Sequence, residues 1–216
     1  MVQIQIIVFD GFDELDAIAP FEVLQTAAAM GADVQAKLVT LDGSTEIVAA
    51  HGLRVQPGAK LRDQLDILIV PGGGWGDRAK QGAWAEAQSG KIPAAISQLH
   101  QSGTTIASVC TGGMLVASAG LLRGRPAITH HVAIEELKAM GAEIVNARVV
   151  DDGDIVTAGG VTSGIDLSLW LLERYLSPQI AYEVEQELEY ERRGVVWQQL
   201  KTPSKTPSKG KLELPN

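Results

Sequence analysis

The sequence predicts an α/β fold in which a doubly wound, mostly parallel sheet is covered by helices on both faces. Short apolar segments rich in β-branched residues alternate along the chain with helical patterns. The apolar segments lack strict alternation of polar and apolar residues, as expected for strands buried on both faces. The length of 216 residues, 45% of them hydrophobic, suits one domain with a sizeable core. Functional residues are then expected beyond the carboxyl ends of the strands.

The predicted strands are short and end at turn-forming residues. Five buried strands are expected at residues 4–9, 34–41, 66–70, 104–109 and 142–145. A further short strand is expected at 127–129. Residues 149–156 carry two apolar runs around an Asp/Gly turn, which is typical of a β-hairpin.

The predicted helices follow from apolar periodicity, early prolines and terminal glycines. They are expected at residues 20–30, 92–101, 112–119, 132–140, 163–175 and 178–193. In the first of them Pro20 would lie near the first turn, and Gly31 just past the end. The domain is expected to cover residues 1–196. Residues 197–216 repeat Lys-Thr-Pro-Ser and carry few apolar groups, which predicts a mobile tail.

Composition narrows the classes of function. The formal net charge of −8 argues against binding to nucleic acid, which needs Lys and Arg to meet phosphates. No apolar run reaches the ~18–20 residues that span a bilayer, and the first residues lack the features of a signal peptide. A single cysteine is consistent with a reducing, cytoplasmic location. No spacing of Cys, His and carboxylate residues suggests a metal site.

Cys110 is the first candidate for chemistry. It ends the strand predicted at 104–109 and is followed by Thr111 and two glycines, where a helix is predicted to begin. Strand, sharp turn and helix together predict a nucleophile elbow. The positive end of the helix dipole would lower the pKa of the thiol, and the Thr111 N–H could bind a developing negative charge. The alternative is that Cys110 is a small buried hydrophobic residue.

Three further groups are candidates, each with a structural alternative. The turn after residues 66–70 contains Gly73 and Gly74, whose backbone could approach a ligand closely or could simply form a tight turn. Asp16 precedes a helix and could be an acid/base group or a helix cap. His130 and His131 could contact a substrate or act as bases, or could be structural.

Several motifs, in order, carry a resemblance to a known family. They are FDGF at residues 9–12, LD at 15–16, PFEVL at 20–24, IVPGGG at 69–74, SVCTGG at 108–113, THH at 129–131 and AGGVTSGID at 158–166. With these motifs residues 3–190 resemble the DJ-1/PfpI superfamily, whose flavodoxin-like fold is shared with class I glutamine amidotransferases. Asp16 in place of Glu, and Thr111 in place of a histidine after the cysteine, resemble the isonitrile hydratases and the amidase-like half of AraC-type regulators. Thr111 also argues against peptidase activity.

The resemblance implies a cofactor-free lyase that hydrates small isocyanides to N-substituted formamides. It implies that Cys110 is the nucleophile and Asp16 the general acid/base, with Thr111, Gly73 and Gly74 holding the intermediate. His130 is assigned to substrate binding. The alternatives are a redox or ligand sensor, or a glyoxalase or amidase on the same scaffold.

The resemblance also implies a homodimer that binds a small-molecule substrate. The apolar residues of the helix predicted at 164–175 occupy more than one face. This helix is therefore expected either to be packed between two layers of its own chain or to contact a second chain. Trp75 could cap the site, or it could be a surface aromatic residue at such a contact.

Overall fold

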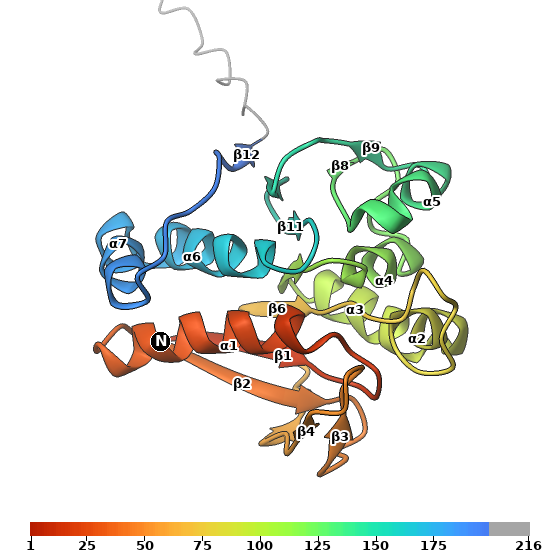
Figure 1. The fold of residues 1–216 in the computed structure, drawn as a ribbon, viewed down its shortest axis with the longest axis horizontal. Helices are drawn as coiled ribbons and strands as arrows, with labels where there is room; N and C mark the ends of the chain where they lie inside the picture. The colour runs from red at the N-terminus through yellow and green to blue at the C-terminus, as the bar shows by residue number, and fades with distance from the viewer. Residues whose placement is uncertain (199–216) are drawn as a thin grey trace, which may run out of the picture.

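The computed structural model describes residues 1–198, which form one central sheet between two helical layers (Figure 1). The strands are β1 (Val2–Ile7), β2 (Val34–Thr40), β3 (Ile47–Val48), β4 (Arg54–Val55), β5 (Ala59–Lys60), β6 (Ile67–Val70), β7 (Thr105–Ser108), β8 (Pro126–Ala127), β9 (Glu143–Ile144), β10 (Val149–Asp151), β11 (Ile155–Ala158) and β12 (Trp197–Gln198). The helices are α1 (Glu14–Ala29), α2 (Ala83–Ser89), α3 (Lys91–Gln101), α4 (Gly112–Ser118), the 3₁₀ helix η1 (His131–Ala133), α5 (Ile134–Ala139), α6 (Ser163–Tyr175) and α7 (Pro178–Glu187).

The central sheet has eight strands in the order β12-β10-β11-β7-β6-β1-β2-β5. The strands from β11 through β7, β6 and β1 to β2 all pair in parallel, whereas β10 runs antiparallel to β11. This topology confirms the predicted doubly wound, mostly parallel fold. The chain leaves β1 toward β2 on one side and later continues through β6 on the other. The switch point therefore lies at β1 and β6, where such sheets place their ligands.

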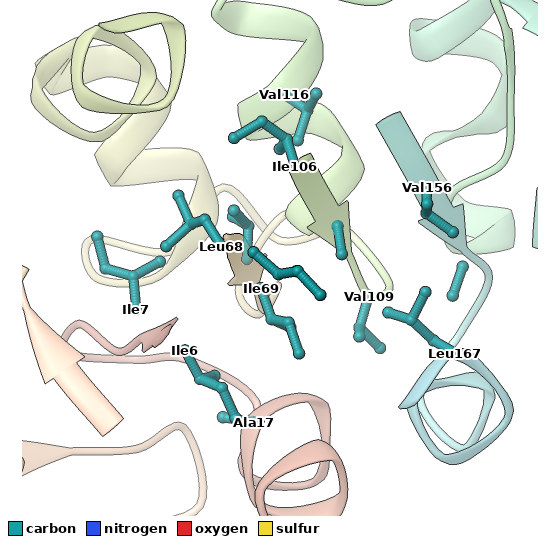
Figure 2. Packing of buried hydrophobic residues seen from close by; sticks show 14 of the residues in the cluster. Ile6, Ile7, Ala17, Leu68, Ile69, Ile106, Val109, Val116, Val156 and Leu167 are labelled. Atoms are coloured by element: carbon teal, nitrogen blue, oxygen red, sulfur yellow. The ribbon is translucent and has the colours of Figure 1, made fainter. Parts of the chain in front are cut away.

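Helices cover both faces of the sheet. The first layer contains α1, α6 and α7, and the second contains α2, α3 and α4 (Figure 1). Side chains of successive strand residues alternate between these layers. Ile6 of β1 lies against Ala17 of α1, and Ile106 of β7 lies against Val116 of α4 (Figure 2). All four side chains are fully buried, so the sheet separates two halves of one hydrophobic core.

The prediction that residues 142–145 form a strand of the central sheet is wrong. Within residues 1–198, β9 pairs with β8 alone, in a separate two-stranded sheet, and β11 takes the place next to β7. The hairpin predicted at residues 149–156 is confirmed as β10 and β11. Of residues 142–145 only Ala142 is buried, so the expected burial on both faces is wrong as well. A short apolar run carries no information about which strand a segment pairs with.

The first helix begins earlier than predicted. α1 starts at Glu14 because Asp13 caps it, with Oδ1 accepting the Leu15 N–H at 3.2 Å. Pro20 consequently lies inside the helix rather than in its first turn. Its ring packs closely against the backbone of Gly164 in α6. The position of Pro20 is thus part of the contact between the two helices.

Smaller differences concern element ends. α2 has no counterpart among the predicted helices, residues 132–140 divide into η1 and α5, and α7 ends at Glu187 instead of 193. Trp197 and Gln198 belong to the predicted tail, but in the structure they form β12 and pair with β10. The rest of the predicted tail, residues 199–216, lies outside the described residues.

The helix predicted at 164–175 is α6, and its own chain covers most of its apolar residues. It packs against α1, α7 and β11. Its partly exposed Trp170 donates its indole N–H to Asp151 Oδ2 at 2.7 Å. Contacts within the chain thus bury most of its apolar residues, while Ile165 stays partly exposed next to α1. Among residues 1–198, no helix has the length and apolar character required to cross a membrane.

Candidate active site

Three segments meet at the carboxyl edge of the sheet. The loop after β1 leads to Asp16 in the first turn of α1, the loop after β6 contains Gly72 to Gly74, and the turn after β7 contains Cys110. Because β1, β6 and β7 are adjacent and parallel, these three loops lie side by side. The sequence placed its candidates at this edge, and the fold brings them together.

Cys110 lies at the apex of a tight turn between β7 and α4. Its φ of 57° is in the left-handed region, which is strained for a residue with a side chain. Its N–H donates to the carbonyl oxygens of Ala158 and Gly159 at 3.2 and 2.9 Å, and its own carbonyl accepts from Thr129 Oγ1 at 2.8 Å. These bonds hold the strained backbone in place. The turn has the strand–turn–helix geometry that the sequence predicts.

Glycine is required where α4 begins. A Cβ atom at Gly112 would lie 2.0 Å from the carbonyl oxygen of Val70, and one at Gly72 would lie 2.3 Å from Thr111 Oγ1. Neither distance is compatible with a side chain. The small residues around Cys110 therefore allow the turn after β7 to approach the end of β6.

Asp16 is completely buried and has one hydrogen bond from the backbone. Its Oδ2 accepts the Gly72 N–H at 3.0 Å, while Oδ1 has no partner among the described residues. Burial, and then the negative charge of Asp13, raise the pKa of Asp16 to about 7, against the smaller lowering effects of Gly72 and the neighbouring Cys110. Asp16 can therefore hold or release a proton near neutral pH.

The pKa of Cys110 is raised, not lowered as the sequence suggested. Burial is the largest cause, since the residue is only 6% exposed, and the charge of Asp16 is the second. The Thr111 N–H at the start of α4 acts in the opposite direction but more weakly. α4 has only seven residues, so its dipole does not outweigh desolvation and a neighbouring carboxylate. At rest the thiol is neutral.

Thr111 and the glycine turn are connected directly. The Gly73 N–H, which the sequence assigned to the substrate or intermediate, donates to Thr111 Oγ1 at 3.0 Å. It is therefore occupied within the protein. The Gly74 N–H has no hydrogen-bond partner within residues 1–198. Of the two glycines, Gly74 is the one that still offers a donor.

His130 makes no hydrogen bond to Cys110 or Asp16. Its Nδ1 accepts the Val132 N–H at 3.3 Å and caps η1, and its ring lies against the backbone of Gly160. Burial and the neighbouring His131 lower the pKa of His130, which favours the neutral imidazole. The hydrogen bond from Val132 and the contact with Gly160 hold the His130 ring in place.

Trp75 is buried, with 4% of its surface exposed, so it is not a surface aromatic residue. Its indole N–H donates to Glu136 Oε2 at 3.2 Å, and its ring meets that of Trp84 edge to face. Arg78 stacks on Trp84 and pairs with Glu136 at 2.8 Å. These contacts anchor the loop after Gly74 to α5.

Sequence reasoning missed three contributors to the site. Thr129 holds the Cys110 carbonyl, Gly72 provides the hydrogen bond to Asp16, and Asp13 raises the pKa of both Asp16 and Cys110. Thr129 and Gly72 lie in motifs that the sequence does show. Asp13 has no local signal of this role, because its effect depends on distances across the fold.

A hollow of about 470 Å³ lies beside this cluster and includes Asp13, Gly73 and Gly74 in its lining. Cys110 and Asp16 do not belong to its lining, but Gly73 and Asp13 connect the lining to them through hydrogen bonds with Thr111 and Gly72. Within residues 1–198 there is no group of three or more His, Cys, Asp or Glu side chains that could hold a metal ion. The arrangement instead offers a thiol, a carboxyl group with a pKa near neutrality, and backbone N–H donors.

Comparison with known proteins gives consistent matches along most of the chain. The profile of the DJ-1/PfpI family matches residues 2–174. The isonitrile hydratase of Pseudomonas putida is 35% identical over 191 residues, which cover 88% of this chain and 78% of that protein. A deglycase of Thermococcus kodakarensis is 27% identical, over 80% of this chain and 96% of that protein.

Solved structures agree with the fold. The crystal structure of a ThiJ/PfpI family protein from Pseudomonas syringae superposes with a TM-score of 0.76 at 26% identity. The match covers 89% of this chain and 76% of the other. The relatives thus include proteins named for two different reactions, and the shared scaffold alone does not select between them.

Proposed function

Since the chain belongs to the DJ-1/PfpI family, we propose that it is a cysteine-dependent lyase that adds water to small isocyanides and releases N-substituted formamides. One observation carries the proposal: a buried carboxyl group with a pKa of about 7 adjoins a neutral thiol. The reaction needs both an acid and a nucleophile, because the isocyanide carbon must gain a proton and a bond to sulfur. The 35% identity to an isonitrile hydratase supports the same reaction.

In the first step, Cys110 and Asp16 act together. Protonated Asp16 gives its proton to the terminal carbon of the isocyanide, Cys110 Sγ bonds to that carbon, and the thiol proton passes to Asp16. The net change is that the S–H bond is replaced by C–H and C–S bonds, giving a thioimidate. A neutral thiol suits this step, since its proton is the one consumed. Covalent capture divides one difficult addition into two easier ones.

In the second step, water adds to the thioimidate carbon. Asp16 takes one water proton and delivers a proton to the nitrogen, leaving a tetrahedral carbon bonded to OH, NH and sulfur. The hydroxyl proton then returns to sulfur through Asp16 as the C–S bond breaks, which yields the formamide and free Cys110. Backbone N–H groups of Thr111 and Gly74 are the donors available for charge that develops on oxygen. No cofactor enters either step.

The raised pKa of Cys110 also argues against the alternative that the protein is a redox sensor. Redox-sensing cysteines are low-pKa thiolates, whereas burial and Asp16 raise the pKa of Cys110. Glyoxalase and amidase activities remain as outcomes of the assay. Because one relative is named a deglycase, the assay also includes a 2-oxoaldehyde as a substrate.

We also propose a homodimer in a reducing, cytoplasmic location. Leu15 of α1 is 40% exposed beside the buried Asp16 and lines an apolar groove with Ile18 and Ile165. A second chain over this groove would cover the edge of the site. Light scattering at micromolar concentration should give about twice the mass of one chain, and a value near 22.9 kDa would contradict the dimer.

The assay compares isocyanides, methylglyoxal and simple amides with the purified full chain. We expect steady formation of the formamide from isocyanides, and its loss in Cys110→Ser, because a serine hydroxyl is a weaker nucleophile than a thiol and gives up its proton less readily. Turnover of methylglyoxal alone would replace the proposal with a glyoxalase. Stoichiometric modification of Cys110 without turnover of any substrate would favour the sensor.

A further inference from the structure

The hollow beside the glycine turn is a second feature of the carboxyl edge that the mechanism does not use. Four segments form it: residues 11–13, the β3–β4 turn at 49–51, Gly73 and Gly74, and the loop at 77–81. Its lining contains glycines, alanines and polar side chains but no large apolar residue. Pockets for apolar ligands are lined mainly by hydrophobic and aromatic side chains. This hollow is therefore suited to a polar group.

Charge pairing leaves the hollow with an acidic character. His51 is held by Glu14, which accepts the His51 N–H at 2.7 Å and lies 2.6 Å from its Nδ1, so these two groups balance each other. The remaining charged side chains of the lining are Asp13, Asp77 and Lys80. Two carboxylates against one ammonium leave one negative charge. Asp13 has no ion-pair partner within residues 1–198.

Asp13 connects the hollow to the reacting groups. Its N–H donates to the Gly72 carbonyl at 2.9 Å, and the Gly72 N–H in turn donates to Asp16. Gly73 lies in the lining on one side and is bonded through its N–H to Thr111, next to Cys110, on the other. The Asp13 carboxylate therefore lies on the side of the glycine turn that faces the hollow, one hydrogen-bonded residue away from Asp16.

We propose that the hollow receives the substituent on the isocyanide nitrogen and that Asp13 makes it prefer a cationic substituent, such as a quaternary ammonium, over a neutral or anionic one. The identity of the reacting group rests on the proposed function. The preference itself rests on the lining and on the unpaired carboxylate. A single partly exposed charge pair contributes a few tenths to one kcal/mol, which corresponds to a preference of up to about fivefold.

The first test compares matched substrates. Hydration of 3-(trimethylammonio)propyl isocyanide is measured against that of the isosteric neutral compound with a tert-butyl group and of a carboxylate analogue. We expect kcat/KM to be about threefold to fivefold higher for the cation than for the neutral compound, with the ratio falling at high salt. Asp13→Asn keeps the side-chain oxygen that caps α1 and should reduce the ratio to about one.

The matched control is Asp63→Asn, which removes the same charge from an exposed residue outside the lining and should leave the ratio unchanged. If Asp13→Asn does not fold, Asp13→Ser retains a capping hydroxyl and serves in its place. A cation preference that survives the loss of the Asp13 charge would overturn the proposal. Faster hydration of the neutral compound by the unmodified chain would overturn it as well.

A second readout does not depend on hydration. Cys110 is the only cysteine, so its modification can be followed by mass spectrometry with methanethiosulfonates, in which the thiol displaces methanesulfinate and forms a mixed disulfide. The trimethylammonioethyl reagent should react faster than the sulfonatoethyl reagent, and Asp13→Asn should bring the two rates together. If the two reagents differ in this way but no isocyanide is hydrated, the proposed reaction is refuted and the preference of the hollow for cations is supported. If isocyanides are hydrated but Asp13→Asn changes neither the kcat/KM ratio nor the ratio of the two modification rates, the cation preference is refuted and the proposed reaction is supported.

Discussion

Replacing Asp16 by asparagine should lower activity. It should also make the variant more stable relative to the native protein at pH 8 than at pH 5. Asparagine keeps an oxygen for the Gly72 N–H but cannot carry a charge or transfer a proton. Turnover should fall by ~100-fold or more, the usual scale of acid–base assistance. The effect on stability follows from the burial of a carboxyl group whose second oxygen has no partner.

The sign of the pH dependence follows from the direction of the shift. The folded-state pKa of Asp16 is about 7, raised from 3.8. Between these values the folded chain keeps a proton that the unfolded chain has lost, so the proton stabilises the folded state. This stabilisation is complete below the unfolded-state pKa and is lost as pH rises through about 7. Between pH 5 and pH 8 the native protein should therefore lose about 3 kcal/mol from this group.

The contribution of Asp16 to the free energy of unfolding can be measured by urea denaturation of the native protein and of Asp16→Asn, each at pH 5 and pH 8. The cost of burying the asparagine amide is the same at both pH values, and other titrating groups are common to both proteins. The difference between the two proteins should thus shift by about 3 kcal/mol in favour of Asp16→Asn at pH 8, with similar m-values. Asp63→Asn should show no such shift. Parallel stability curves at the two pH values would refute a raised pKa for Asp16.

Three further outcomes follow from the site. Iodoacetamide should alkylate Cys110 more slowly than a free thiol at pH 7.5, with a rate still rising at pH 9, and a plateau below pH 8 would contradict the raised pKa. Thr129→Val removes the hydrogen bond to the Cys110 carbonyl and should lower the free energy of unfolding by about 1–3 kcal/mol in urea titrations. Gly112→Ala places a Cβ 2.0 Å from the Val70 carbonyl oxygen and should yield little folded protein by circular dichroism, so a native-like melt would count against the close approach.

Local sequence patterns determined the architecture and the position of the turn. Apolar runs that end at glycines, with helical patterns between them, require a parallel sheet covered on both faces. The sequence around Cys110 places small residues where a strand must turn sharply into a helix. These features depend on neighbours in the chain, so the fold class and the place of the Cys110 turn and the glycine turn at one edge could be predicted. The place of Asp16 opposite Cys110 was expected only from the family resemblance.

Only the tertiary structure decided which segments pair and which charges act on one another. The apolar runs at β9 and β11 look alike in sequence, but only β11 joins β7. The start of α4 suggested a reactive thiolate, whereas burial and the nearby Asp16 raise the pKa of Cys110. Periodicity and turn signals are read from adjacent residues, while desolvation and Coulomb interactions depend on distances through space. The protonation of the site is therefore a property of the folded chain.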